Sequence, residues 1–319
     1  MKNDFSNIFE FREFDLTPKS DEELLLAEYT RDVVEIKAKN LNEHAFLCEL
    51  IHSLSFANTQ RYLFCLEKCL TEKDSEALNN LIFQYARASL LPGCSGGYDQ
   101  CERVIPAFFA LACGDLDSMK RLFPQGLPAS KNGYPFLCVM YDLMVAILWQ
   151  DEDLVAPALL KAGKFAASKK PLNEREAIKF MLALHAKEPT AMSEHLQQFC
   201  ASFGRTEAPQ FEKRLYLFAH GLHALARYTL PFEIFEAIKL PKSENFSKFY
   251  AERLFQNEIS KPQLYFAFPP EFEKVNVILN APPARTRIYQ PYLPGDKTYF
   301  LDHDAMINDL ADEILQHHK

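Results

Sequence analysis

The sequence has little of what marks β-rich, membrane-spanning or secreted proteins. Only 10 of its 319 residues are glycine, which disfavours a β protein with many tight turns. Its longest apolar run, Pro135 to Trp149, is shorter than the roughly 20 residues that a membrane helix needs, and Asp142 interrupts it. The polar start, Met1 to Phe5, is not followed by the apolar segment of a secretory signal. We therefore expect a cytoplasmic protein that does not contact membranes.

The sequence also lacks an excess of basic residues. Its 35 Lys and Arg are outnumbered by 43 Asp and Glu, which gives a net charge of −8 at pH 7. Duplex nucleic acid is a poor partner for such a chain, because phosphate binding needs clustered Lys and Arg. A basic protein is a better partner, because opposite charges speed the encounter.

Motifs of catalysis and of cofactor binding are missing as well. The chain has no GxSxG motif, no Walker loop and no dinucleotide fingerprint. The one glycine-dense segment, Leu91 to Gly97, has no lysine and follows an expected helix rather than a strand. A plain loop is therefore favoured over a phosphate-binding loop, and Cys94 within it has no identifiable base. These absences predict a protein that is not an enzyme and that needs no cofactor.

The eight cysteines include no CxxC pair. Most lie in apolar helical patterns, where a free thiol packs as a small apolar residue, and this usage fits a reducing compartment. Cys65 and Cys69 are four residues apart and would share a helix face, so two metal ligands are possible there. No matching His or Cys pair is nearby, so core packing is favoured and no metal site is predicted.

Apolar residues at helical spacing are abundant, most clearly from Tyr134 to Ala162. The first half of this stretch is apolar nearly all round, which predicts a helix covered on several sides. A polar turn at Gln150–Asp153 and a second apolar-striped run follow, with Gly163 as the expected stop. The pattern predicts an αα-hairpin with a buried first arm, around which the rest of the chain is organised.

The same unit recurs along the chain. The segments ALACGDLD, AILWQDED and ALHAKEPT align at offsets of 36 (151 minus 115) and 37 (188 minus 151) residues. In each, a small or apolar helix end meets an acidic turn, and a second helix begins. Such a period is typical of stacked helical hairpins. We therefore predict an all-α fold of stacked antiparallel hairpins, similar to TPR proteins and α-solenoids, with three repeats over 103–204.

Further helices are expected before and after the repeats. Capping-box patterns at Ser20–Glu23 and Thr71–Asp74 predict helix starts, and apolar spacing predicts helices from Asn42 and over about 58–70. A fourth helix pair with an apolar stripe from Phe211 to Ala226 should close a helical domain over 1–261. That domain would comprise N-terminal helices over 1–95, the repeats, and closing helices over 205–261.

The composition changes from Pro262 onward. The segments Leu264–Pro270, Val275–Leu279 and Arg285–Tyr289 cluster β-branched and aromatic residues between prolines, which predicts short strands or extended segments. A final amphipathic helix is expected from Asp304 to His317. We interpret 262–319 as an appendage packed on the helical body.

Two acidic turns are the first candidates for a functional site. Asp115 with Asp117, and Asp151 with Asp153, could be paired carboxylates for acid–base chemistry or for a divalent metal. Their recurrence at the same point of each unit is what helix capping predicts, so capping is favoured. Their exposed sides would then be free to meet a partner.

Other candidates have simpler interpretations. His220 and His223 lack an HExxH arrangement, so ordinary surface and boundary histidines are favoured, and His303 is expected at the start of the last helix. The single tryptophan, Trp149, is either a binding anchor or, as we favour, a half-buried plug between hairpins. Pro157 would lie inside its helix, at a cost of roughly 3 kcal/mol, if that helix starts at Asp151; a start at Asp153 would bring it closer to the first turn.

Four of these segments resemble the immunity protein 49 family of bacterial polymorphic toxin systems. They are ALACGDLDSMKRLF, YPFLCVMYDLMVAILWQDEDLVAPALL, FMLALHAKEPTAMSEHLQQF and RLYLFAHGLHALARYTLP, and the resemblance covers about 45–235. The family is all-helical, its members are encoded beside toxins, and it brings no catalytic residues.

The resemblance implies an antidote that binds a cognate toxin domain, expected to be basic, and blocks it inside the producing cell. The alternative is a helical-repeat scaffold that binds a peptide or a complex; an enzyme acting on a toxin's product would need a metal or nucleophile cluster. We expect a monomer or small homo-oligomer. The partner-binding candidates, chosen as acidic and aromatic turn positions, are Asp115, Asp117, Tyr134, Trp149, Asp151, Glu152 and Asp153.

Overall fold

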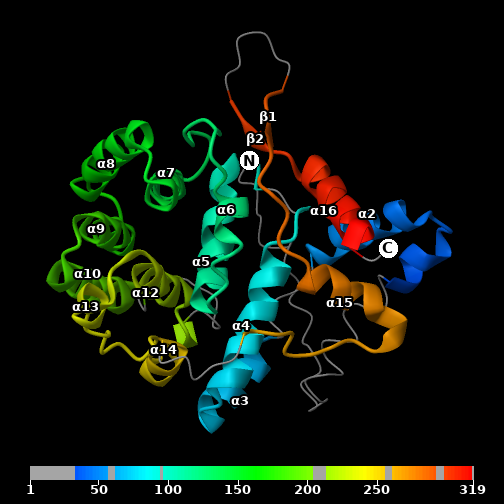
Figure 1. Cartoon of the computed structure of the whole chain (residues 1–319), viewed down its shortest axis with the longest axis horizontal. Helices are drawn as coiled ribbons and strands as arrows, with labels where there is room; N and C mark the ends of the chain where they lie inside the picture. The colour runs from blue at the N-terminus through cyan, green and yellow to red at the C-terminus, as the bar shows by residue number, and fades with distance from the viewer. Residues whose placement is uncertain are drawn as a thin grey trace, which may run out of the picture.

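The computed structural model describes residues 33–56, 62–93, 96–203, 213–255, 261–291 and 298–317. These residues form helices packed on one another and a single two-stranded sheet, so the all-α prediction is confirmed (Figure 1). The elements are α2 (Glu43–Leu54), α3 (Tyr62–Glu72), α4 (Ser75–Ser89), η2 (Gln100–Arg103), α5 (Val104–Ala112), α6 (Met119–Leu122), α7 (Pro135–Trp149), α8 (Glu152–Ala166), α9 (Leu172–Ala186), α10 (Pro189–Phe203), α12 (Leu217–Thr229), α13 (Phe232–Glu236), α14 (Lys248–Phe255), η3 (Pro270–Phe272), α15 (Glu273–Asn280), β1 (Ile288–Tyr289), β2 (Phe300–Leu301) and α16 (His303–His317).

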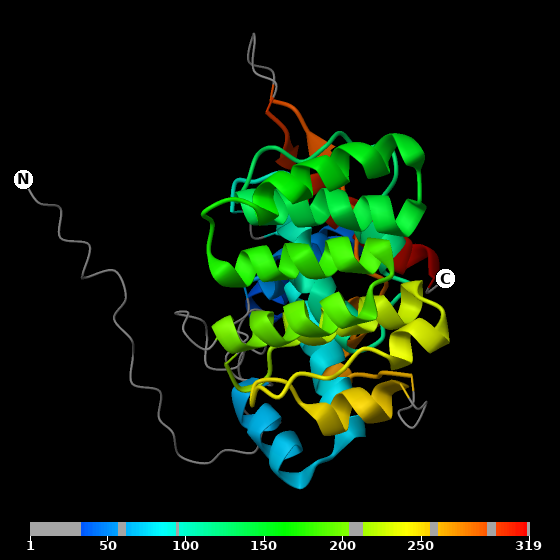
Figure 2. The same ribbon diagram turned by 90° about the vertical axis from the view of Figure 1, so that its left-hand side faces the viewer.

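Helices α7 to α10 form an array of two stacked hairpins, in which α8 packs on both α7 and α9 (Figure 2). The chain reverses at Gln150 and at Lys187, both in the left-handed conformation. Pro189 occupies the first position of α10, where its missing N–H costs nothing. Gly163 does not end α8, which continues to Ala166, and Pro157 lies inside that helix.

The first predicted repeat is not a hairpin. Helix α6 is a single turn, and the nine-residue α5 packs instead against α12 and α4. Gly221 on α12 makes this contact possible, because a β-carbon there would collide with the carbonyl oxygen of Phe108 on α5. The rings of Phe108 and Phe218 stack with centroids 4.2 Å apart beside it. Helix α5 is therefore covered by α4 and α12, while α7 is covered by α8, η2, α9 and α5 as expected.

The start of α4 differs from the capping box predicted at Thr71–Asp74. The Thr71 hydroxyl donates to the Glu67 carbonyl at 2.7 Å and so belongs to the last turn of α3. The N-cap is Asp74, whose carboxylate accepts from the backbone N–H groups of Glu76 and Ala77. Asn42 caps α2 as expected. The helix start predicted at Ser20–Glu23 lies outside the described residues, as does Cys94.

The main core is formed by buried residues of α3 to α14, from Tyr62 to Ala251. A second core lies on the other side of α4 and joins distant parts of the chain. Leu47, Leu50 and Ile51 of α2 pack with apolar residues of α15 and α16. Residues 275–279, predicted as extended, are helical in α15 instead. The Asn276 side chain bonds both backbone groups of Phe268, at 2.7 and 2.8 Å, which fixes the extended segment beside that helix. The expected extended structure near Arg285–Tyr289 is present as β1, paired antiparallel with β2.

Arg87 on α4 connects the two cores. Its guanidinium lies 2.9 Å from the Asp115 carboxylate and also donates to the Ala281 carbonyl at 3.1 Å. Both charged side chains are nearly buried, with 10% and 8% of their surface exposed. The Arg87 side chain therefore links the turn after α5, through its ion pair, to the end of α15, through its hydrogen bond.

Candidate partner-binding surface

The turn between α7 and α8 projects acidic side chains from one edge of the array. Helix α7 ends at Trp149, and the Asp151 carboxylate caps α8 by accepting from the Asp153 backbone N–H at 3.0 Å. The capping interpretation is therefore confirmed for Asp151. Glu152 and Asp153 are exposed. This geometry leaves the carboxylates of both residues available to a partner.

A groove of about 500 Å³ lies directly beside this turn. It is bounded by the end of α7, the first half of α8, the end of α9 and the end of α12, and the left-handed residues Gln150 and Lys187 stand at its rim. The apolar side chains that line it are Ala146, Ile147, Val155, Ala156, Leu159, Leu184 and Leu230. Glu152, His185 and Lys187 supply the charged or polar rim. An apolar floor with a few polar groups is typical of a site that receives an anchoring side chain.

The Trp149 side chain packs behind the turn, against the segment around α6. Its indole N–H donates to the Phe123 carbonyl at 2.8 Å, and the Lys120 ammonium lies 5.2 Å from the ring centroid. The ring is half-buried as predicted, but it packs on the segment around α6, which is not a hairpin. A second hollow, between the 125–128 loop and Asp151, opens on the other side of the turn, where the Gln125 amide donates to the Asp151 carboxylate at 3.2 Å.

Two of the other predicted partner residues are not part of this surface. Asp115 was expected as an exposed cap, but its side chain is only 8% exposed beside Arg87 and accepts the Ser118 hydroxyl at 2.7 Å instead of capping α6. The prediction for Asp115 is wrong, because a nearly buried arginine binds the carboxylate. Asp117 is exposed as expected, but it does not cap α6, which has no side-chain cap. Tyr134 is 44% exposed and donates to Glu174, but it lies at the far end of α7, about 22 Å along the helix from the turn.

The predicted surface histidines His220 and His223 are in fact buried on α12, with 3% and 4% exposure. His220 stacks on Phe246 and accepts from the Ser247 backbone N–H at 3.1 Å, while His223 packs among Phe235, Phe246 and Phe255. Burial lowers the pKa of both imidazoles to about 3, since the charged form loses its hydration. These histidines are neutral core residues. His303 begins α16 as predicted, and the Gly93 N–H donates to it at 2.9 Å.

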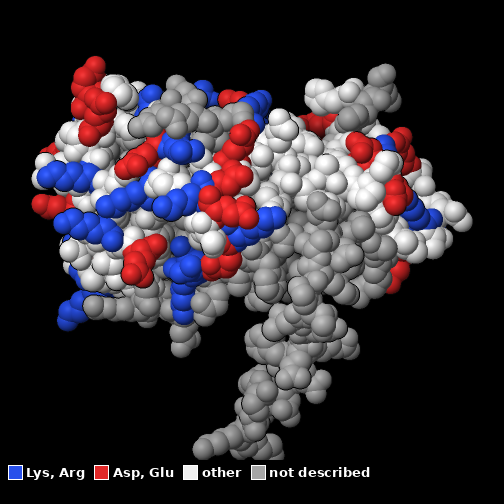
Figure 3. Space-filling view, turned by 90° about the horizontal axis from the view of Figure 1, so that it is seen from below, with Lys and Arg blue, Asp and Glu red and all other residues white. Residues whose placement is uncertain are grey.

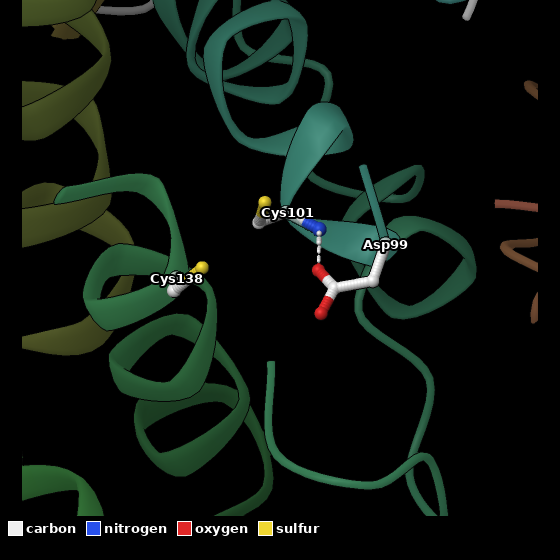
Figure 4. Close-up of side chains that lie close together, drawn as sticks. All are labelled: Asp99, Cys101 and Cys138. Atoms are coloured by element: carbon white, nitrogen blue, oxygen red, sulfur yellow. Dashed lines mark hydrogen bonds between the residues drawn. The ribbon is translucent and has the colours of Figure 1, made fainter. Parts of the chain in front are cut away.

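The described residues contain one group with metal-ligand chemistry, formed by Asp99, Cys101 and Cys138 (Figure 4). All three are buried, and their ligand atoms lie within 4.8 Å of one another. Sequence reasoning missed this group, because the two cysteines are 37 residues apart (138 minus 101) and neither has a paired neighbour. Cys65 and Cys69, by contrast, are buried as the core-packing interpretation predicted.

Each oxygen of the Asp99 carboxylate already accepts two hydrogen bonds. One accepts from the Cys101 N–H and the Ser130 hydroxyl, at 3.0 and 2.7 Å, and the other from the N–H groups of Lys131 and Asn132, at 2.7 and 2.8 Å. A carboxylate offers about four acceptor positions, and all are used. Asp99 therefore holds the 130–132 loop, and a metal could bind only by displacing part of it.

Seen from below, the left-hand side of the molecule carries Lys and Arg interspersed with Asp and Glu, so neither sign dominates that face (Figure 3). Within the described ranges, the helices are too short or too polar to span a bilayer.

Comparison of the chain with known protein families, curated proteins and solved structures found no match.

Proposed function

We propose that this protein is an immunity protein that binds and neutralises a cognate bacterial toxin domain by direct contact and without catalysis. The observation that carries the proposal is the groove beside the 150–153 turn, where exposed acidic residues flank an apolar floor. The stacked hairpins and the resemblance of four segments to an all-helical immunity family support it. The partner we propose is a basic toxin domain, which inserts an apolar side chain into the groove and places Lys or Arg near Glu152 and Asp153.

The chemistry of the groove fits such a contact. Apolar anchors buried in pockets provide most of the affinity of an interface, whereas charges at the rim mainly speed association. Glu152 is both exposed and part of the groove lining, so it can act on a basic partner from the rim.

Co-expression with the product of the neighbouring gene tests the function. We expect that product to be toxic alone, harmless together with this protein, and co-purified with it in a tight 1:1 complex whose association rate falls as salt rises. A neighbour that is harmless alone and does not co-purify would contradict the proposal. Several weak partners that bind extended peptides would favour a scaffold instead.

Two pairs of variants test the surface separately. Ala156→Arg fills the groove, whereas Ala167→Arg adds the same exposed side chain at the other end of α8. We expect the first to weaken the complex on the order of tenfold or more, and the second to change it little. Glu152→Lys should slow association several-fold, while Glu271→Lys, the same charge change on η3, should have less effect. Equal effects within each pair would place the interface elsewhere.

A further inference from the structure

The thiols of Cys101 and Cys138 form a contact pair inside the fold. Cys101 lies on η2 and Cys138 in the first turn of α7, and their sulfur atoms are within 4.8 Å of each other (Figure 4). The Cys101 thiol donates to the Asn132 carbonyl at 3.9 Å and lies beside the Cys138 sulfur, and this closeness lowers the pKa of Cys138 and raises that of Cys101. The nearby Lys161 ammonium lowers the pKa of Cys138 further. The pair is therefore unequal, with Cys138 as the better thiolate.

The surroundings favour a reaction between these sulfurs over binding of a metal. The Asp99 carboxylate is saturated by its four donors, one of which is the Ser130 hydroxyl. The two sulfurs lie within 4.8 Å of each other, and formation of a disulfide requires rotation of the two side chains toward each other.

A thin cover separates the pair from solvent. Gly133 packs directly on Cys101, since a β-carbon at that position would collide with the Cys101 sulfur. Gly133 and Asn132 are themselves half-exposed, and Lys131 is exposed. The sulfurs therefore lie one backbone layer below the surface, under a loop that Asp99 holds by hydrogen bonds. A small oxidant needs only a local opening of this loop to reach them.

We infer that Cys101 and Cys138 are an oxidation site at which a hydroperoxide forms a disulfide between η2 and α7. The Cys138 thiolate attacks the peroxide, so that a sulfur–oxygen bond forms, the oxygen–oxygen bond breaks and hydroxide leaves. The Cys101 sulfur then attacks the sulfenic sulfur; the sulfur–sulfur bond forms, and the oxygen leaves as water with the Cys101 proton. With hydrogen peroxide, two thiols and one peroxide become one disulfide and two waters. This inference does not depend on the proposed function.

Peptide mapping of the full, reduced chain tests the inference. The chain is treated with hydrogen peroxide, blocked with N-ethylmaleimide, digested at Arg and Asp so that Cys94 separates from Cys101, and analysed without reduction. We expect a Cys101–Cys138 linked peptide, lighter than its two parts by two hydrogens. It should form on the order of tenfold faster in the folded chain than in urea, because folding raises the effective concentration of one thiol near the other. A link that forms no faster in the folded chain would overturn the inference.

Single-site variants separate the two roles. In Cys101→Ser, Cys138 should accumulate as a sulfenic acid that dimedone labels, whereas in Cys138→Ser, Cys101 should stay a thiol. Cys200→Ser is the matched control, because Cys200 is a buried thiol whose pKa is raised by burial, and it should leave the rate of linkage unchanged. Dimedone labelling of Cys101 rather than Cys138 would contradict the assigned order of attack. If a variant does not fold, the comparison of folded and unfolded wild-type chain still decides.

Discussion

The α7–α10 array and the second core differ in how far apart in the sequence their contacts lie. In the array, Lys161 bonds Asp142 and His195 bonds Glu176, each across 19 residues. In the second core, Lys274 bonds Glu43 across 231 residues, and Lys37 reaches the Glu271 carbonyl across 234. The array can therefore form from local hairpins, whereas the second core must wait until the two ends of the chain meet.

Because the second core forms from distant segments, its attachment to the rest of the protein depends on a few side chains. Arg87 binds Asp115, in the turn after α5, and the Ala281 carbonyl at the end of α15. Arg121 on α6 likewise bonds Glu313 on α16 and the Pro283 carbonyl, at 2.5 to 2.7 Å. These buried or half-buried charges, rather than apolar contacts alone, hold α15 and α16 of the second core against α4 and α6.

The largest effect is expected from Asp115→Asn. The change keeps the shape of the side chain but leaves Arg87 almost buried without a counter-charge, which should cost about 3–5 kcal/mol in the free energy of unfolding. Urea denaturation measures it. Asp117→Asn, two residues away and exposed, is the control and should change stability by less than about 0.5 kcal/mol. Similar small effects for both would mean that the two regions are held together without this ion pair.

Two cavity-creating substitutions, one in the second core and one in the α7–α10 array, should show whether these two regions unfold locally and independently. Leu50→Ala in α2 and Leu196→Ala in α10 each remove a fully buried side chain, and each should cost about 2–5 kcal/mol. Amide hydrogen exchange then localises the loss. We expect Leu50→Ala to raise exchange in α2, α15 and α16, and Leu196→Ala to raise it in α9 and α10. Uniform changes across the chain would instead indicate one cooperative unit.

Acid should weaken the packing around α12, where His220 and His223 are buried. His220 and His223 have pKa values of about 3 in the folded chain, below the ordinary value of about 6.5 in the unfolded chain. Their contribution is therefore complete above pH 6.5 and is lost as the pH falls from 6.5 toward 3. One unit below 6.5, the loss is about 1.4 kcal/mol for each histidine. Denaturation curves at pH 7.5 and 5.5 test this, and His223→Phe should remove part of the slope; an unchanged slope would contradict the burial of that ring.

The smallest effect concerns α8 alone. Pro157 lies inside this helix and cannot donate to the carbonyl four residues earlier. Pro157→Ala should therefore raise the free energy of unfolding by about 1 kcal/mol, after allowing for the greater freedom of the unfolded chain. Pro189→Ala, at the first position of α10, should give no such gain. If the two substitutions act alike in thermal denaturation, Pro157 is better accommodated than its position indicates.

The sequence predicted the array well, because its signals are local. The apolar spacing of α7, the cap at Asp151 and the proline at the start of α10 each depend on a few neighbouring residues. The helix α15 was missed since its residues Val275, Val277 and Ile278 have strand-like preferences, and contacts with α2 and α4 decide their structure. The repeat pattern also misled at α5, where the packing partner is α12 rather than the next helix in the chain.

The candidate site was predictable only in part, for the same reason. Glu152 and Asp153 lie on a turn that a polar sequence marks plainly, and both are exposed as expected. Asp115 has the same local pattern, but Arg87, which comes from a different helix, draws it into the interior. The groove and the Cys101–Cys138 pair likewise combine segments from separate parts of the chain, and periodicity within one segment carries no information about them.

The close approach of α12 to α5 has a consequence for recognising distant kin of this chain. At Gly221 the two backbones meet without room for any side chain. Homologous sequences can therefore replace most apolar residues around this point, but not the glycine itself. A sequence search can use this constraint. A search pattern that requires glycine at position 221, an aromatic residue at position 218 and a short apolar helix like α5 would therefore still detect homologues whose overall sequence identity is low.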